Sequence, residues 1–449
     1  MIIFTVVAIL FLIATFLTHY FYEEYLWFKS VETWVPWFQS FSWWPWKRFV
    51  RILYWFGWEL LWLGVIAFYS KFNRASSYYL ISTMCVIVWM VAVFKMYWND
   101  PAPYMDRKYI DAFECDQNTF MTPSLEVTIS AFAYSMMFYL AFDWIEIRRP
   151  KVKLNRPNPA GGARDTQNLF EEQEPEFFLH DATTYMKDKN NDFKFWVYLS
   201  LVFYLVFLIA YAGMYIGAQT LDQVLFAMCL GYGFFCILYY FHKDSACERI
   251  VKVSEKMLPN SKTLGYFLIH LIFMGVLLII ARVFYHFQIK DFTVNPGWKS
   301  EHYDQCGLLT FPSFFDKEML YAYNFAYLFF GIALGLTFDS IVLGGTRVDY
   351  NQVRESEDRK PFIAFIIRFL VTIVWVLLCL WGGIALLKLL VHRWLFILAI
   401  PYFVCGFGLF SIIKYVFKLL HASRPEINPI PDVAAVELRT ADRPPVNAR

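Results

Sequence analysis

The stretch 195–216 has the sequence FWVYLSLVFYLVFLIAYAGMYI and contains no charged side chain. A helix needs about 20 apolar residues to cross the roughly 30 Å hydrocarbon core of a bilayer. This stretch is long enough, so it predicts a membrane-spanning helix. The whole chain has the same character, since 58% of its 449 residues are hydrophobic and only 17% are charged. Soluble domains are about 45–50% apolar and about 25% charged, which argues against a soluble globular enzyme.

Nine further apolar stretches of similar length are spread along the chain. The fold class that they predict is all-α, a polytopic membrane bundle of about ten transmembrane helices. The first stretch has no basic residues before it and no clear cleavage site, so we interpret it as a retained helix and not as a signal peptide. The ten stretches are 2–18, 52–69, 78–97, 125–145, 195–216, 222–241, 264–285, 320–343, 361–387 and 394–417.

The composition divides the chain into four parts, namely 1–48, 49–242, 243–420 and 421–449. The first part contains a spanning helix and then the segment 22–46, which holds six of the 17 Trp residues. Trp and Tyr prefer the headgroup level of a membrane, so we expect this segment to be interfacial. The second part is a membrane core interrupted by a polar loop at 147–192. The third contains further spanning helices, and the last is a polar tail.

Basic residues are distributed unevenly between the two predicted sides of the membrane. We call side A the side that the chain reaches after the first helix, and side B the opposite side. Of the 40 Lys and Arg residues, 26 fall on side B, 11 on side A and three within helices. Positive charge is retained on the cytoplasmic side or its equivalent, which predicts that side B, with both termini, faces the cytoplasm or a mitochondrial matrix. The endoplasmic reticulum and the mitochondrial inner membrane both remain open as locations.

Metal and nucleic-acid sites are not predicted. The net charge is only +2, which is too small for a typical nucleic-acid-binding protein. The eight His residues are scattered and no two have the i, i+4 spacing of a helical metal site, so no metal and no cofactor is expected. Two cysteines, Cys115 and Cys306, both fall in side-A loops and could form a disulfide if that side is oxidising.

Three polar segments mark the side-A ends of the helices in the core. Lys95 ends one apolar stretch and is followed by Ala102-Pro103. The sequence Pro123-Ser124-Leu125-Glu126 opens the next stretch. The 195–216 stretch ends with Ala212-Gly213 and is followed by Gln219 and Gln223. Ionisable residues at the membrane edge are costly and often mark a site.

The order and spacing of these segments resemble the type-2 phosphatidic acid phosphatase superfamily, which includes glucose-6-phosphatase and the sphingosine-phosphate phosphatases. The resemblance covers about 50–242. It implies a phosphate site made of three motifs: Lys with Arg-Pro, Pro-Ser-Gly-His, and Ser-Arg with a later His. In that family basic side chains and a Ser bind the phosphate, one His attacks phosphorus, and the other protonates the leaving group.

Most of the reactive residues of the family are replaced in this chain. Lys95 and Ser124 match, and the resemblance implies that they are the candidates for binding a phosphate or a lipid headgroup. The four degenerate positions are Ala102 and Gly213, where the family has Arg, and Glu126 and Gln219, where it has His. An amide cannot act as the nucleophile, and an ionised Glu126 would repel a phosphate. We therefore expect that the reaction has been lost.

A non-catalytic membrane protein is the function that these replacements favour. Retention of the fold without the chemistry points to a structural or accessory subunit of a larger membrane complex, with lipids and other subunits as partners. Two alternatives remain at this point. An active phosphatase would release phosphate from a lipid or sugar phosphate, and a transporter or channel would contain a through-going polar cavity.

Overall fold

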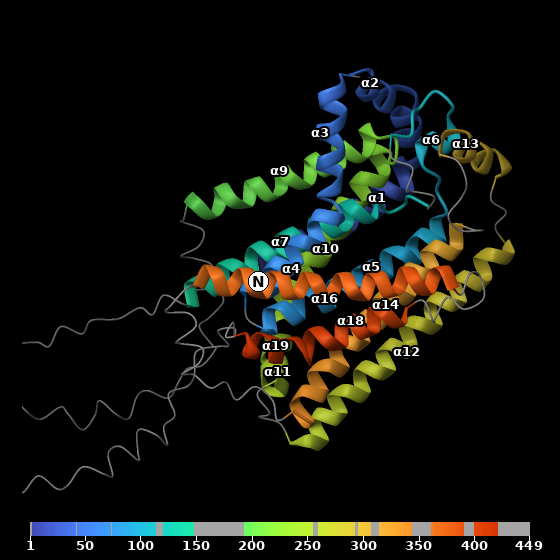
Figure 1. Cartoon of the computed structure of the whole chain (residues 1–449). Coiled ribbons are helices and arrows are strands. Elements are labelled where there is room, and N and C mark those ends of the chain that lie inside the picture. Colours follow the sequence, from blue (N-terminus) through green and yellow to red (C-terminus); the bar gives the residue numbers. More distant parts are fainter. Residues whose placement is uncertain are drawn as a thin grey trace, which may run out of the picture.

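The computed structural model of the chain describes residues 2–41, 43–72, 74–113, 120–147, 193–254, 259–291, 295–306, 314–343, 361–389 and 399–420. Within these ranges the chain forms helices and no strand, which confirms the all-α prediction. In chain order the elements are α1 (Ile2–Lys29), the π-helix η1 (Ser30–Trp34), α2 (Val35–Ser40), α3 (Trp44–Trp55), α4 (Glu59–Lys71), α5 (Arg74–Trp98), α6 (Pro103–Asp106), α7 (Leu125–Ile147), α9 (Phe193–Tyr215), α10 (Leu221–Ile237), the π-helix η2 (Leu238–His242), α11 (Lys243–Ser254), α12 (Asn260–Asp291), α13 (Pro296–Cys306), α14 (Phe314–Ile341), α16 (Pro361–Leu389), α18 (Ile400–Phe410) and α19 (Ile413–Leu419) (Figure 1).

Six helical segments among the described residues are long and apolar enough to cross a membrane, and the number is eight if each of two bent pairs is one span. The bent pairs are α3 with α4, at 46°, and α18 with α19, at 44°. The two other predicted stretches, 2–18 and 125–145, are also helical, in α1 and α7. A polytopic membrane bundle is therefore confirmed, and the total of ten spans stays a prediction.

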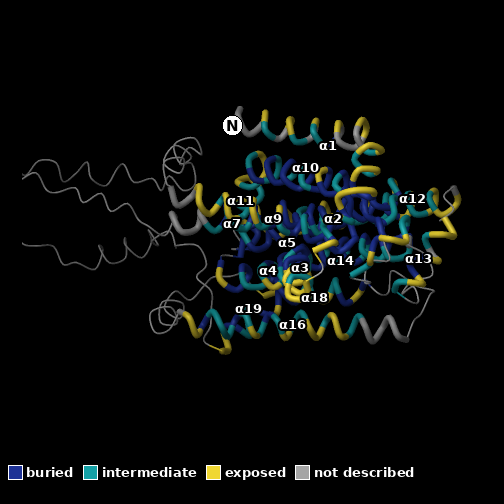
Figure 2. The backbone as a smooth tube through the Cα atoms, turned by 90° about the horizontal axis from the view of Figure 1, so that it is seen from above, coloured by how far each residue is buried: buried dark blue, intermediate teal, exposed yellow. Residues whose placement is uncertain are grey.

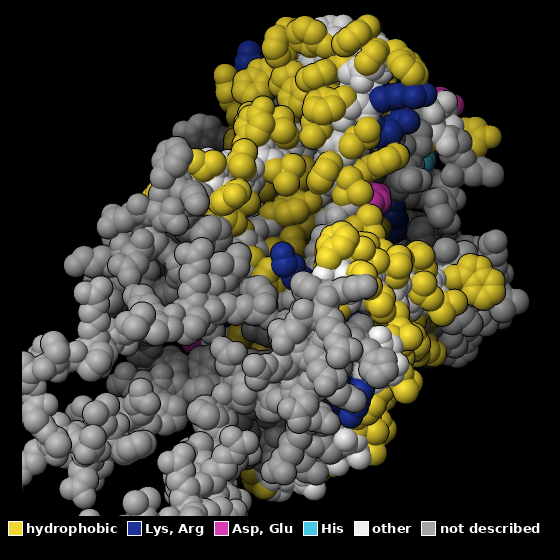
Figure 3. Space-filling view, turned by 60° about the vertical axis from the view of Figure 1, so that its left-hand side comes forward, with side chains coloured by type: hydrophobic (Ala, Val, Ile, Leu, Met, Phe, Trp, Pro, Cys, Tyr) yellow, Lys and Arg dark blue, Asp and Glu magenta, His cyan; other side chains and the backbone are white. Residues whose placement is uncertain are grey.

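The middle of the bundle is formed by α5, α10 and α14, and Figure 2 shows α1 and α16 at its opposite edges. In the most apolar window of α5, 83% of the residues are buried, against 17% in α16 and 11% in α12. Lipid tails are as apolar as a protein core, so edge helices of membrane proteins can keep large hydrophobic side chains on their outer faces. Figure 3 shows such a surface, on which the described side chains are mainly hydrophobic.

The C-terminal helices pack closely against the core through α14, which contacts α5, α12 and α18. Glycines allow this approach. A Cβ at Gly331 would lie 2.2 Å from the Phe403 carbonyl oxygen, and one at Gly335 would lie 2.6 Å from the Phe407 carbonyl oxygen. Small residues that let two backbones meet are a general feature of membrane helix pairs.

The Trp-rich segment 22–46 is mostly helical. Its first part continues α1 as far as Lys29, and the remainder forms η1, α2 and the start of α3. The side chains of Ser30 and Gln39 are buried and bind the core. The Ser30 hydroxyl accepts a hydrogen bond from the Leu221 backbone N–H at 3.0 Å, and the Gln39 amide donates to the Tyr215 carbonyl at 3.1 Å. The segment is thus attached to the turn between α9 and α10.

The polar loop 147–192, apart from Ile147, and the tail 421–449 lie outside the described residues.

Candidate functional site

Three of the sequence-predicted site residues are joined by hydrogen bonds. Gln219 Nε2 donates to Glu126 Oε2 at 3.1 Å, and Ser124 Oγ donates to the same oxygen at 3.3 Å. Glu126 lies in the first turn of α7 and Gln219 lies in the turn before α10. The positions where the family has its two His residues are therefore in direct contact in this chain, through an amide and a carboxylate.

Ser124 is also part of the helix start. Its hydroxyl accepts a hydrogen bond from the Val127 backbone N–H at 3.3 Å, which is the usual role of a Ser at a helix N-terminus. The same hydroxyl therefore both caps α7 and donates to Glu126. Glu126 Oε2 thus accepts hydrogen bonds from two neutral side chains, Ser124 and Gln219.

Two glycines make room for this arrangement. A Cβ at Gly213 would lie 2.3 Å from Gln219 Oε1 and 2.7 Å from its Cδ, so the Gln219 side chain occupies the space that any larger residue at 213 would need. A Cβ at Gly57, at the bend between α3 and α4, would lie 2.9 Å from Glu126 Cβ. The absence of two side chains thus lets Glu126 and Gln219 approach each other.

The turn that carries Gln219 depends on Gly217. Gly217 has φ +78°, a conformation that favours glycine, and a Cβ there would lie 2.6 Å from the Asp111 carbonyl oxygen. After the turn, Gln223 accepts a hydrogen bond from the Thr220 backbone N–H at 3.0 Å and donates to the Pro101 carbonyl at 3.3 Å. Gln223 therefore holds the link between α5 and α6 in place.

Ala102 is placed differently from the other degenerate positions. Its side chain is fully buried in an apolar cluster that includes Met96, Tyr104 and Met121. Ala102 is thus part of the hydrophobic core. A guanidinium at this position would need its own hydrogen-bond partners within that core.

Lys95 is buried, with only 3% of its side chain exposed, and it faces a carboxylate that the sequence did not predict. Its Nζ lies 3.9 Å from Oε1 of Glu318, whose side chain is 1% exposed. Glu318 belongs to the first turns of α14, outside the region of the phosphatase resemblance. Glu318 of α14 therefore partly compensates the charge of Lys95, although α14 lies outside the region of the phosphatase resemblance.

Comparison with protein-family models agrees with the resemblance. The model of the PAP2 superfamily matches residues 76–247. This part of the chain belongs to the PAP2 superfamily. It runs from the start of α5 into α11 and contains all three motif remnants. Neither curated proteins nor solved structures give a match to the chain.

One member of the predicted disulfide can be described. Cys306, at the end of α13, is disulfide-bonded, whereas Cys115 lies outside the described residues, so their pairing stays a prediction. Six other cysteines are free thiols.

Sequence reasoning did not find Glu318 because its helix carries no family motif. One feature of the sequence could have indicated Glu318. It lies at the side-A end of the apolar stretch 320–343, at the same predicted depth as Lys95.

Proposed function

We propose that this chain is a non-catalytic PAP2-superfamily protein of a membrane. The observation that carries this proposal is the hydrogen bond between Gln219 and Glu126, at the two positions where the family has its nucleophile and its general acid. Gln219 cannot perform the nucleophilic step, because an amide is a poor nucleophile. Glu126 Oε2 is engaged as an acceptor by Gln219 and Ser124.

The charge of the site also opposes phosphate binding. Phosphoryl transfer depends on cationic donors that stabilise the spread negative charge of the transition state. Gly213, Ala102, Glu126 and Gln219 supply none, and Lys95 faces Glu318. The Gln219 side chain further fills the space next to Gly213. A phosphate would meet one partly compensated ammonium and one carboxylate.

A phosphatase assay of the purified chain in lipid nanodiscs tests this proposal. The substrates are p-nitrophenyl phosphate, a lipid phosphate and a sugar phosphate, and the matched variant is Lys95→Ala. We expect phosphate release at the buffer rate for both proteins, because removal of catalytic groups lowers hydrolase rates by on the order of 10⁴- to 10⁶-fold. Release above the buffer rate that Lys95→Ala abolishes would establish an active phosphatase instead.

We further propose a structural role as a subunit of a membrane assembly, with lipids and protein as partners. The support is the retained bundle combined with the replaced chemistry, and the wide apolar outer faces of α12 and α16. Extraction from native membranes in a mild detergent, followed by native electrophoresis and crosslinking, is the test. The chain should migrate with other proteins above its own 53.2 kDa, and a monomeric particle contradicts the proposal.

A further inference from the structure

Two cysteines outside the PAP2 region face each other where α16 packs on α18. Figure 2 shows these two helices next to one another at the edge of the bundle. The thiol of Cys379, from α16, and the thiol of Cys405, from α18, are hydrogen-bonded to each other. Both thiols are free and only partly buried. Two thiols in direct contact are close enough to form a disulfide without a large movement of the backbone.

The contacts on either side of the thiol pair fix this alignment of the two helices. One turn away in one direction, Trp375 Nε1 donates to the Cys405 carbonyl at 3.2 Å, and a Cβ at Gly408 would lie 2.1 Å from the Trp375 ring. One turn away in the other direction, a Cβ at Gly383 would lie 3.7 Å from the Pro401 ring. As α16 advances by one turn, α18 therefore recedes by one turn, which is the pattern of two antiparallel helices in contact along one face. The helix packing itself thus brings the two sulfurs together.

A covalent bond at this position would join a loosely packed helix to the core. In the most apolar window of α16 only 17% of the residues are buried. The partner helix α18 is held tightly, because Gly331 and Gly335 let its backbone approach α14. A disulfide between α16 and α18 would therefore fix an edge helix to the middle of the bundle.

The thiols lie beside the lipid-facing surface. Leu378, next to one cysteine, is 59% exposed, and Val404, next to the other, is 41% exposed. Cys379 lies within the apolar segment Phe362–Gly383, four residues before its end. A charged oxidant such as glutathione disulfide would have to leave water to reach these sulfurs, which is costly. An uncharged organic hydroperoxide dissolves in the hydrocarbon layer and can approach them from the lipid.

We propose that Cys379 and Cys405 are a redox-sensitive pair, which an organic hydroperoxide of the membrane converts into a disulfide between α16 and α18. The sulfur of one thiol attacks the terminal oxygen of the hydroperoxide, the O–O bond breaks, and the alkoxide leaves as an alcohol with the proton of the thiol. The product is a sulfenic acid. The second sulfur then attacks the first, the S–S bond forms, and the hydroxyl leaves as water with the second proton.

The reaction balances without a further reactant. The two thiols lose two electrons and two protons, and the hydroperoxide is reduced to one alcohol and one water. The proposal goes beyond the non-catalytic role, because it assigns chemistry to residues outside 76–247 and holds whatever the phosphatase assay gives.

Thiol mapping of the full chain is the test. The protein is placed in nanodiscs of saturated phosphatidylcholine, reduced, treated with cumene hydroperoxide, unfolded in detergent with N-ethylmaleimide, digested and analysed by mass spectrometry. We expect the alkylation of Cys379 and Cys405 to be lost together, and a peptide pair that joins them to appear. A reductant should restore both thiols. The internal control is Cys229, a partly buried free thiol of α10 that contacts Thr15, whose alkylation should not change.

The variants Cys379→Ser and Cys405→Ser should each lack the joined peptide, whereas the matched control Cys229→Ser should keep it. The wild-type measurement holds even if a variant does not fold. Full alkylation of both cysteines after the treatment overturns the proposal, and so does a sulfonic acid at either position without the joined peptide. A link from Cys405 to Cys85, which also lies near it, overturns it as well. An equal yield of the joined peptide with oxidised glutathione overturns the assignment of a membrane-soluble oxidant.

Discussion

Helices α5 and α14 are joined by a buried ion pair at each end, and the two ion pairs differ in their N–O distance. At the side-B end, Arg74 Nη1 lies 2.6 Å from Asp339 Oδ2, while at the side-A end Lys95 Nζ lies 3.9 Å from Glu318 Oε1. Both pairs join α5 to α14. They show that the same pair of helices can be held firmly at one end and loosely at the other.

The side-B pair is part of a complete network. Asp339 also pairs with Lys414 and accepts a hydrogen bond from Tyr415 at 3.4 Å, and Arg74 donates to Ser254 at 3.3 Å and to the Phe410 carbonyl. Glu318 Oε1, in contrast, accepts no hydrogen bond from a described residue. A buried polar network whose groups have partners rigidifies a core, whereas a buried group without them is costly.

The largest effect is predicted for Asp339→Asn, which removes the charge that Arg74 and Lys414 share. Leaving buried cations uncompensated typically costs about 3–5 kcal/mol, so the free energy of unfolding should fall by about that amount. Thermal unfolding in nanodiscs measures it. A change below about 1 kcal/mol would show that the side-B network does not stabilise the bundle.

Glu318→Gln should have a smaller effect than Asp339→Asn. The 3.9 Å separation is too long for a direct hydrogen bond, so less interaction is lost, and we expect a cost of about 1–2 kcal/mol. The same unfolding measurement ranks the two variants. If Glu318→Gln is the more harmful, the contrast between a firm and a loose end is wrong.

Gly213→Ala tests whether Gln219 fills the space next to Gly213. The new Cβ would displace the Gln219 amide from Glu126, at an expected cost of about 1 kcal/mol. In a Gln219→Ala background the same change should cost almost nothing, because no atom then occupies that space. Additive costs in the double-mutant cycle would contradict the geometry of the site.

The smallest effect is a pH dependence confined to side A. Because the folded-state pKa of Glu23 is about 7, above its ordinary value of 4.5, the folded protein binds this proton more tightly than the unfolded chain. The contribution of Glu23 to stability is therefore present below about pH 4.5 and is lost as the pH rises through about 7. Melting temperatures between pH 5 and 8 should decline less in Glu23→Gln than in the wild type, and parallel curves would contradict this.

Much of the bundle could be predicted from the sequence, because long apolar stretches leave a chain few alternatives to membrane helices. The motif spacing also placed Ser124, Glu126, Gly213 and Gln219 in one region, where the structure brings them into contact. The course of 22–46 was harder to predict, since aromatic residues suit both an interface and a packed helix. Its attachment through Ser30 and Gln39 depends on polar contacts with residues more than 170 positions away.

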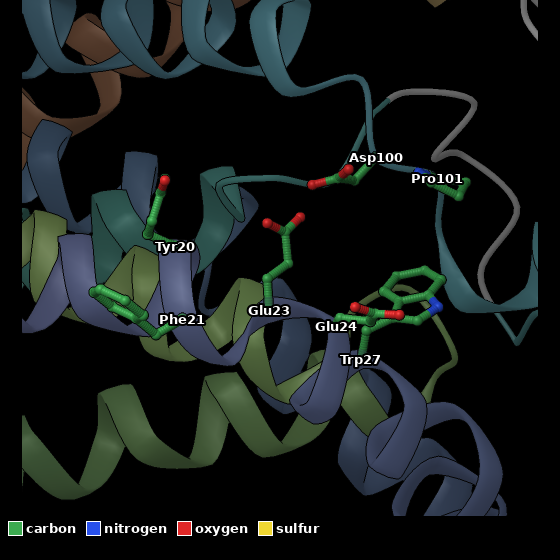
Figure 4. A pocket seen from close by; sticks show the side chains of 7 residues that line it. All are labelled: Tyr20, Phe21, Glu23, Glu24, Trp27, Asp100 and Pro101. Atoms are coloured by element: carbon green, nitrogen blue, oxygen red, sulfur yellow. The ribbon is translucent and has the colours of Figure 1, made fainter.

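The contacts of Glu318 and of Glu23 could not be predicted from motifs. Glu318 meets Lys95 only because α14 packs along α5, and this tertiary contact has no local signal. In the same way Glu23 of α1 (Figure 4) and Asp222 of α10 are brought together by the docking of these two helices.

The spacing of the two ion pairs has a consequence for the membrane in which the chain resides. Arg74 and Lys95 are 21 residues apart, and so are Glu318 and Asp339. At about 1.5 Å per residue the two pairs are about 32 Å apart, close to the thickness of a bilayer's hydrocarbon layer. Charged contacts at both ends oppose sliding of one helix along the other. The protein therefore has a fixed hydrophobic length, and a markedly thinner or thicker bilayer would have to deform around it.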